Sequence, residues 1–258
     1  MNGKIKALSL FFLLTMTAVA SVAIGSPEEA VNIAGKQRMY TQRMLKDYAM
    51  TGMGNTFGDP GKDLSETVNN FTDHLQALKA YAKRAETKKS LDEVEALWQP
   101  IKQMLSDKPE KEKVEKLQVD MDVLLHAADK ATKLFAKESG KASGEIVNMA
   151  GRQRMLSQRM ASLYMLKVWG VKDPKFKTKL DETLTLFKSS LETLEKSPLN
   201  SEEIHGLLAK VKRSFIFFEM MNRSSSKFVP TLIYKKSNDI LKNMNRVTQL
   251  YVSSESKK

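Results

Sequence analysis

The sequence predicts an all-α protein built from two tandem four-helix bundles that arose by internal duplication. Residues 31–44 and 147–160 are identical at ten of fourteen positions, and the other four are close substitutions. Apolar residues recur in steps of three and four, as at Val114, Leu117 and Met121, which is typical of helices packed at shallow angles. No segment shows the strict alternation of a half-buried strand.

The duplication extends over nearly the whole chain at a constant offset of 116 residues. Phe71 and Leu75, for example, correspond to Phe187 and Leu191. Self-similarity of this kind predicts two homologous structural units. We therefore divide the chain into a signal peptide at 1–25, a first bundle at 26–144 and a second bundle at 145–258.

We expect helices at 29–53, 61–86, 90–106 and 110–140, then at 145–169, 174–196, 200–224 and 230–253. Asp59 and Asp173 are each followed by proline, so each supplies an N-cap with proline at the first helical position. These two aspartates therefore mark the start of the second helix in each unit.

Other helix boundaries are marked less directly. Segments 90–93 and 200–203 resemble capping boxes at the start of the third helices. Pro100 is expected to kink its helix, because proline removes a backbone donor. Gly140 and Gly144 lie between the units, so the fourth and fifth helices either form one rod or break there.

The N-terminus has the layout of a secretory signal peptide. Lys4 and Lys6 precede an apolar run that ends at Ala23, where small residues offer cleavage sites. We expect cleavage because threonine and serine interrupt the run, although its length approaches that of an uncleaved membrane anchor. The absence of cysteine excludes disulfides and thiolate chemistry, and it fits a helical protein of the bacterial periplasm.

The formal net charge of +12 would suggest nucleic acid in a cytosolic chain, but export argues against that partner. The lysines are spread along the helices as a solvated face that could attract small anions. His74, His126 and His205 are scattered without metal-ligand spacing, and we expect each to be partly exposed. Asp120 and Asp122 cannot share a helix face, and both are expected to be solvated.

No phosphate-binding loop, nucleophile elbow or metalloprotease motif occurs in the sequence. No pair of carboxylates and no nucleophile–base pair stands out either. We therefore expect a protein that is not an enzyme and that carries no metal and no cofactor.

The duplicated segment carries a polar pattern that packing alone does not require, since a core needs only apolar residues of suitable volume. Residues at i, i+3 and i+4 share a helix face. The two resulting clusters are Arg38, Thr41 and Gln42, and Arg154, Ser157 and Gln158. Each cluster offers a guanidinium, a hydroxyl and an amide, which are donors suited to a small planar oxyanion.

Gly35 and Gly151 lie about one turn before these arginines, where small residues would let another helix approach closely. The alternative for either motif arginine is that it reaches solvent or pairs with a nearby carboxylate. The second arginines lie about 140° further round the helix. Of these, Arg43 can pair with Asp47, whereas Arg159 lacks an equivalent partner four residues on.

The string VNMAGRQRMLSQRMA at 147–161 closely resembles the first helix of PilJ-like sensor domains. These are the periplasmic N-terminal domains of type IV pilus methyl-accepting chemotaxis transducers. More loosely, the string resembles the periplasmic motif of nitrate/nitrite sensor histidine kinases. The resemblance implies a four-helix bundle and, from the nitrate sensors, an anion held between two first helices by the arginine before methionine. Those positions here are Arg38 and Arg154.

We therefore expect a secreted sensor-type module that binds a small anion such as nitrate or nitrite and has no signalling domain of its own. If the bundles pack side by side, Arg38 and Arg154 form one site across a pseudo-twofold axis. If they stack end to end, each arginine needs a partner chain and a homodimer follows. The rival is a ligand-free interaction protein whose motif faces dock on a membrane-bound chemotaxis or pilus transducer, or on themselves.

Overall fold

The computed structural model describes residues 23–140, 142–223 and 229–255. Within these ranges the chain forms eight α-helices and no strand, so the all-α prediction is confirmed. The predicted signal peptide lies outside the described residues, apart from residues 23–25. Among the described helices, none has the length and apolar character that a bilayer-crossing segment needs.

Each repeat contributes four helices, and the helices correspond in order. The first repeat contains α1 (Pro27–Gly52), α2 (Pro60–Tyr81), α3 (Ala85–Ser106) and α4 (Lys111–Ser139). The second repeat contains α5 (Ala142–Val168), α6 (Phe176–Glu195), α7 (Glu202–Arg223) and α8 (Pro230–Glu255). Gly140 follows α4 in a left-handed conformation with φ of 64°, so α4 and α5 are separate helices. The division of the chain into units at residue 144 stays a prediction.

Two of the predicted helix starts are confirmed by their capping contacts. Asp59 accepts a hydrogen bond of 3.2 Å from the backbone N–H of Lys62, and Pro60 is the first residue of α2. Ser201 accepts a hydrogen bond of 3.3 Å from the backbone N–H of Ile204, one turn into α7.

Two other predicted starts are wrong. Asp173 does not cap α6, because its carboxylate instead accepts hydrogen bonds of 2.8 Å from the backbone of Lys175 and from Lys179 Nζ. The third helix begins at Ala85, so Ser90 lies inside it. The additional turn of α3 is held against α4, since the buried Thr87 donates a hydrogen bond to Glu138.

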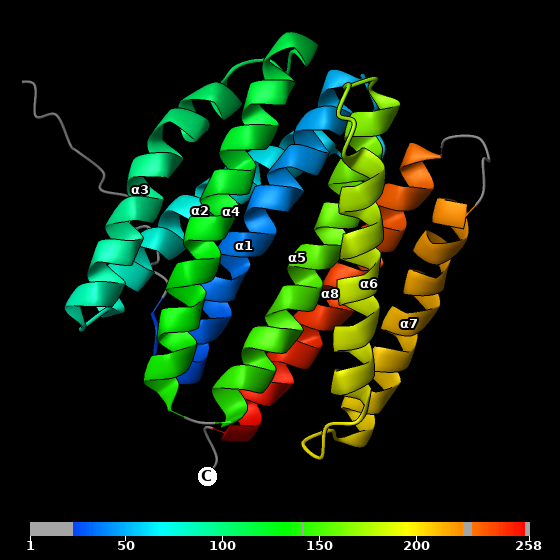
Figure 1. Ribbon diagram of the computed structural model, residues 1–258. Coiled ribbons are helices and arrows are strands. Elements are labelled where there is room, and N and C mark those ends of the chain that lie inside the picture. The colour runs from blue at the N-terminus through cyan, green and yellow to red at the C-terminus, as the bar shows by residue number, and fades with distance from the viewer. Residues whose placement is uncertain (1–22, 141, 224–228, 256–258) are drawn as a thin grey trace, which may run out of the picture.

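The two repeats pack side by side through their first helices (Figure 1). Helix α1 lies against α2 and α4 of its own repeat and against α5 of the other, while α5 lies against α6 and α8. Helices α3 and α7 lie at opposite outer edges of the assembly. The duplicated motif therefore lies on the two most central helices of the molecule.

Each half of the core carries one aromatic pair between the second and third helices of its repeat. The ring centroids of Phe71 and Trp98 are 4.2 Å apart between α2 and α3, and those of Phe187 and Phe215 are 4.5 Å apart between α6 and α7. Burial of a side chain of this size stabilises a fold by about 2 kcal/mol. These pairs fix the outer helices of each repeat around the central α1 and α5.

Candidate functional site

The first helices of the two repeats meet at a pair of glycines. A Cβ atom placed on Gly35 of α1 would lie only 4.0 Å from Cα of Gly151 in α5. The neighbouring Ala34 and Ala150 are also buried. Small residues thus allow the two backbones to approach closely at this point, which we call the α1/α5 crossing.

Two arginines converge at the α1/α5 crossing. A Cβ atom on Gly35 would lie 3.3 Å from Nη2 of both Arg38 and Arg154, and one on Gly151 would lie 3.4 and 3.2 Å from the same two atoms. Arg38 and Arg154 expose 0% and 1% of their surface. The structure therefore brings these four predicted site residues together and keeps both guanidinium groups out of bulk water.

Arg38 is paired with a carboxylate. Its Nη1 lies 2.6 Å from Oδ1 of Asp129 in α4, and its Nη2 donates a hydrogen bond of 3.2 Å to the backbone carbonyl of Asn148 in α5. The second carboxylate oxygen of Asp129 forms an ion pair of 2.7 Å with Lys133. Arg38 thus has a fixed counterion inside its own repeat.

Arg154 donates only to neutral acceptors. Its Nη1 lies 2.9 Å from Oδ1 of Asn32 and 3.2 Å from Oδ1 of Asn245, and its Nη2 lies 3.1 Å from the carbonyl oxygen of Asn32. Apart from burial, the ionisable groups that shift the pKa of Arg154 among the described residues are Arg38 and Tyr40, and neither is a carboxylate. The asparagine at 32 therefore makes an interhelical contact with the opposite repeat.

The two arginines differ because Asp129 and Asn245 occupy equivalent positions, 116 residues apart. Burial lowers the pKa of Arg38 despite Asp129, and burial followed by repulsion from Arg38 lowers the pKa of Arg154 to about 9. A guanidinium stays protonated at neutral pH. The crossing consequently holds a buried positive charge that its hydrogen-bonding groups leave uncompensated.

Two further cations flank the crossing. Lys36 is half-buried, and burial followed by repulsion from Arg154 lowers its pKa to about 8. Arg152, at the equivalent position of α5, is also half-buried and contributes to the lowered pKa of Arg38. A small anion bound here would relieve this repulsion.

Three polar atoms at the crossing are buried without a hydrogen-bond partner among the described residues. They are Nε of Arg38, Nε of Arg154 and Oδ1 of Asn148. Buried polar atoms of this kind are usually satisfied, so they mark a place where another polar group would fit. The Nη atoms already donate to protein acceptors, so an anion would use the Nε edges or replace an amide acceptor.

The two hydroxyl groups of the predicted clusters do not reach the arginine head groups. Thr41 Oγ1 donates a hydrogen bond of 2.9 Å to the backbone carbonyl of Arg38, and Ser157 Oγ donates one of 2.8 Å to that of Arg154. Serine and threonine inside helices commonly bond to a carbonyl of the preceding turn. These hydroxyls are therefore used within their own helices.

The two predicted amides lie further along the same interface. Gln42 Oε1 accepts a hydrogen bond of 3.1 Å from Ser162, and Gln158 Oε1 accepts one of 2.8 Å from Lys46. Both glutamines are buried and link α1 to α5. They connect the repeats, but they hydrogen-bond away from the arginine pair.

Another pair of retained polar residues explains part of the duplicated pattern. Gln37 donates a hydrogen bond of 3.1 Å to the carbonyl of Phe71, and Gln153 donates one of 3.0 Å to the carbonyl of Phe187. Each bond ties the first helix of a repeat to the second. The presence of glutamine at this position in both repeats is therefore explained by an interhelical hydrogen bond, without a ligand.

A buried cluster around Lys46 was not apparent from the sequence. Lys46 Nζ donates to Gln158 at 2.8 Å and to Asn238 at 2.7 Å, and it lies 4.3 Å from the ring centroid of Tyr234. Lys46 and Asp47 both expose 0% of their side chains. Burial lowers the pKa of Lys46 to about 8 and raises that of Asp47 to about 6. The equivalent positions of α5 hold serine and leucine. This difference between the repeats is the feature of the sequence that could have pointed to the cluster.

The second arginines of the motif make ion pairs away from the crossing. Arg43 lies 3.5 Å from Asp47, as predicted, and also 3.0 Å from Asp63 of α2. Arg159 lies 2.8 Å from Asp122 of α4. The expectation of a solvated Asp122 is therefore wrong, because the side-by-side packing brings α4 next to α5.

The histidines do not form a metal site. His126 and His205 are exposed, but His74 is 7% exposed, so the expectation of partial exposure is wrong for it. Its Nδ1 lies 3.3 Å from the hydroxyl of Tyr40, and burial followed by repulsion from Lys36 lowers its pKa to about 4. In the described ranges, no group of acidic and histidine side chains could hold a metal ion.

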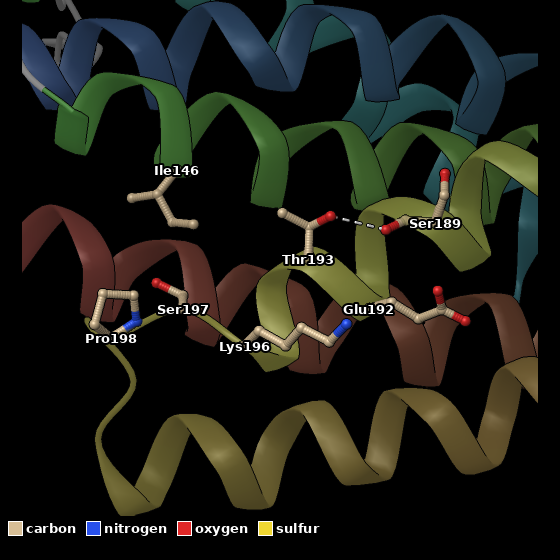
Figure 2. Close-up of a pocket in the computed structure, with 7 residues that line it drawn as sticks. All are labelled: Ile146, Ser189, Glu192, Thr193, Lys196, Ser197 and Pro198. Carbon is tan, nitrogen blue, oxygen red and sulfur yellow. Dashed lines mark hydrogen bonds between the residues drawn. The ribbon is translucent and has the colours of Figure 1, made fainter.

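A surface pocket of the second repeat lies between the start of α5 and the end of α6, and neither motif arginine lines it (Figure 2). It is lined by Ile146 of α5 and by six residues between 189 and 198 at the end of α6. Its hydroxyl groups are partly engaged, since Thr193 donates a hydrogen bond of 3.0 Å to the carbonyl of Ser189. Most of its charged and polar side chains are exposed, so it offers no built ligand site.

Comparison with protein families gives a match that repeats along the chain. The model for the type IV pili methyl-accepting chemotaxis transducer N-terminal family, PilJ, matches residues 26–131 and again 135–214. The two matches agree with the duplication and with the family resemblance of the α1 and α5 sequences. A comparison with curated proteins and one with solved structures gave no match.

Proposed function

The chain belongs to the PilJ family of type IV pili methyl-accepting chemotaxis transducer N-terminal domains, and from this we propose that it binds a small anion, such as nitrate or nitrite, in the periplasm. Domains of this family are helical sensory modules of chemotaxis transducers. Such a module needs a ligand or a partner that biases its helix packing, and no catalytic group.

The observation that carries the proposal is the buried guanidinium pair at the α1/α5 crossing. Arg38 and Arg154 are buried, yet among the residues that the structure describes only Asp129 offers them a carboxylate. An uncompensated charge inside a protein is costly, and it is normally paired. An anion at the crossing would supply the missing charge, and the free Nε donors of both arginines would supply hydrogen bonds.

A planar oxyanion suits these donors. A guanidinium presents Nε and Nη hydrogens in one plane, which match two oxygens of a flat anion. Nitrate and nitrite have this shape, and they carry a single negative charge. The glycines at 35 and 151 make room for the two guanidinium groups, since a Cβ atom at either position would lie 3.2–3.4 Å from their Nη2 atoms.

The rival function is a ligand-free interaction module. This rival hypothesis requires the motif faces to be accessible to a transducer. Ala34, Gly35 and both arginines are buried inside the chain, so the motif faces do not offer such a docking surface. The packing of α1 on α5 also supplies both arginines without a second copy, so a homodimer is not needed to complete the site. A membrane-bound transducer remains the expected partner for the outer surface.

Calorimetric titration of the purified chain with sodium nitrate and sodium nitrite tests the proposal. The wild-type protein should bind one anion per chain, and Arg154→Gln should abolish binding. Arg159→Gln is the matched control, because it removes the same charge from the same helix but lies in a separate ion pair with Asp122.

Circular dichroism should show native helix content in each variant. If Arg154→Gln does not fold, Arg154→Lys keeps the charge but loses the planar donor pair, and its affinity should fall at least about tenfold. Absence of binding to the wild-type protein, or equal binding by a folded Arg154→Gln variant, would overturn the proposal.

A further inference from the structure

The α1/α5 crossing is nearly symmetric, but the two repeats differ at one pair of isosteric residues. Asp129 of α4 contacts Nη1 of Arg38 at 2.6 Å, and Asn245 of α8 contacts Nη1 of Arg154 at 3.2 Å. A single atom separates the two side chains, and it decides whether the neighbouring arginine has a counterion.

We propose that this difference makes the crossing selective for one singly charged anion, bound on the Arg154 side, because Asp129 already fills the anionic position at Arg38. The inference rests on the proposed function and specifies which anions the site accepts. It assigns Asp129 and Asn245 as the residues that determine the charge and the number of bound anions.

The charges at the crossing lead to this selectivity. Among the hydrogen-bonding groups of the crossing, Arg38, Arg154 and Asp129 together carry one net positive charge, which a singly charged anion would bring to zero. Lys36 and Arg152 flank the crossing but are only half-buried, so the surrounding water weakens their contribution to this sum. A doubly charged anion would leave an excess negative charge in a buried place, which is strongly unfavourable. A second anion at Arg38 would have to displace Asp129 from an existing ion pair.

The contacts also show which side can open. The acceptors of Arg154 Nη1 are amide oxygens of Asn32 and Asn245, and a neutral amide can rotate away without leaving a bare charge. The carboxylate of Asp129 cannot leave Arg38 without separating two charges. An incoming anion therefore replaces an asparagine at Arg154 more easily than the aspartate at Arg38.

The equivalent asparagines Asn32 and Asn148 show a second difference between the repeats. Asn32 Oδ1 binds Arg154, whereas the equivalent Asn148 Oδ1 is buried without a partner among the described residues. Asp129 has taken the position at Arg38 that an asparagine oxygen holds at Arg154. In the first repeat, the carboxylate of Asp129 thus occupies the place at the arginine that an added anion would take in the second repeat.

The test exchanges the two residues between the repeats, singly and together. The variants are Asn245→Asp, Asp129→Asn and the double variant with both exchanges, which keeps the net charge of the wild-type protein. Each is titrated calorimetrically with sodium nitrate and with sodium sulfate at constant ionic strength, since screening alters charge effects.

We expect Asn245→Asp to weaken nitrate binding at least about tenfold, because Arg154 then has a carboxylate of its own. Asp129→Asn should raise the affinity for sulfate relative to nitrate at least about tenfold, because two uncompensated guanidinium groups match two negative charges. The double variant should recover nitrate binding, now on the Arg38 side. In that background, Arg38→Lys should therefore lower the affinity for nitrate more than Arg154→Lys does.

Each outcome decides one question. If the wild-type protein binds nitrate but the exchanges change neither affinity nor the preference for nitrate, the selectivity proposal is overturned and the proposed function stands. If the wild-type protein binds neither anion, the proposed function fails and this inference fails with it. Recovery of nitrate binding in the double variant supports the assignment, because a general loss of structure would not be reversed by a second substitution.

Discussion

Arg154 in the second repeat donates a hydrogen bond of 2.9 Å to the side chain of Asn32, which lies 122 residues earlier in the chain. The equivalent asparagine, Asn148, has a buried side-chain oxygen without a partner among the described residues. Both asparagines accept a hydrogen bond from an arginine through their backbone carbonyl, but only the side chain of Asn32 adds a second one.

Substitution of Asn32 by alanine should destabilise the protein by about 1–3 kcal/mol, because Arg154 loses an acceptor while it stays buried. Asn148→Ala is the matched control and should cost clearly less, since its side-chain oxygen has no bond to lose. The free energy of unfolding in urea measures both effects. Equal losses in the two variants would show that this hydrogen bond does not hold the repeats together.

Gly35 and Gly151 give the second prediction. Alanine at an open helical position is worth about 1 kcal/mol more than glycine. Gly206 of α7 is such a position, since a Cβ there would meet no atom within 4 Å, and Gly206→Ala should stabilise the protein. Gly35→Ala should bring no such gain, because its methyl group would lie 3.3 Å from Nη2 of both arginines.

Thermal unfolding of these two variants compares the effects directly. The Gly35→Ala variant should also lose affinity for nitrate, because the arginines must shift to make room for the methyl group. A Gly35→Ala protein that is as stable as the Gly206→Ala protein would show that the arginines move freely at the crossing.

Much of the fold could be predicted because it follows from local patterns. The repeat offset of 116 residues and the heptad spacing predicted all eight helices, and the glycines at 35 and 151 indicated a close helix contact. The start of α3 was misplaced because its first turn is held by a contact with Glu138, which a local capping pattern does not reveal.

The site was predictable only in part for a similar reason. Arg38 and Arg154 stand out as repeated polar residues, but their partners Asp129 and Asn245 each lie 91 residues away, on another helix. Which acceptor meets which arginine depends on how α4 and α8 pack, and no spacing rule encodes this. Helix spacing predicts that the hydroxyls of Thr41 and Ser157 share a face with the arginines, but it does not reveal that a backbone carbonyl of the preceding turn accepts each hydroxyl.

Asp47 gives a pH-dependent prediction. Burial raises its pKa from 3.8 to about 6, although Lys46 and Arg43 lie nearby. The folded protein therefore binds a proton that the unfolded chain has released between these pH values, and the free energy of unfolding falls as the pH rises through this window. The change assigned to this group is about 3 kcal/mol at most.

Asp47→Asn should remove this dependence without changing the shape of the side chain. Urea unfolding at several pH values between 4 and 7 measures the difference between the variant and the wild-type protein. A constant difference over that range would contradict a protonated, buried Asp47.

His74 predicts a dependence of the opposite sign. Burial, then Lys36 and Arg154, lower its pKa from 6.5 to about 4, so the folded protein keeps the ring neutral where the unfolded chain takes up a proton. Its contribution to stability is fully present above pH 6.5 and is lost as the pH falls towards 4. The loss assigned to this ring is about 3 kcal/mol at most.

The variant His74→Gln keeps an acceptor for the hydroxyl of Tyr40 and should be less sensitive to acid than the wild-type protein. The effects of Asp47 and His74 oppose each other between about pH 4 and 6, so the wild-type protein alone shows only their sum. The two single variants separate them: Asp47→Asn should unmask a steeper loss of stability in acid, and His74→Gln should unmask a gain. Identical acid profiles for both variants would mean that neither the pKa of Asp47 nor that of His74 differs between the folded and the unfolded chain, which would contradict both predictions.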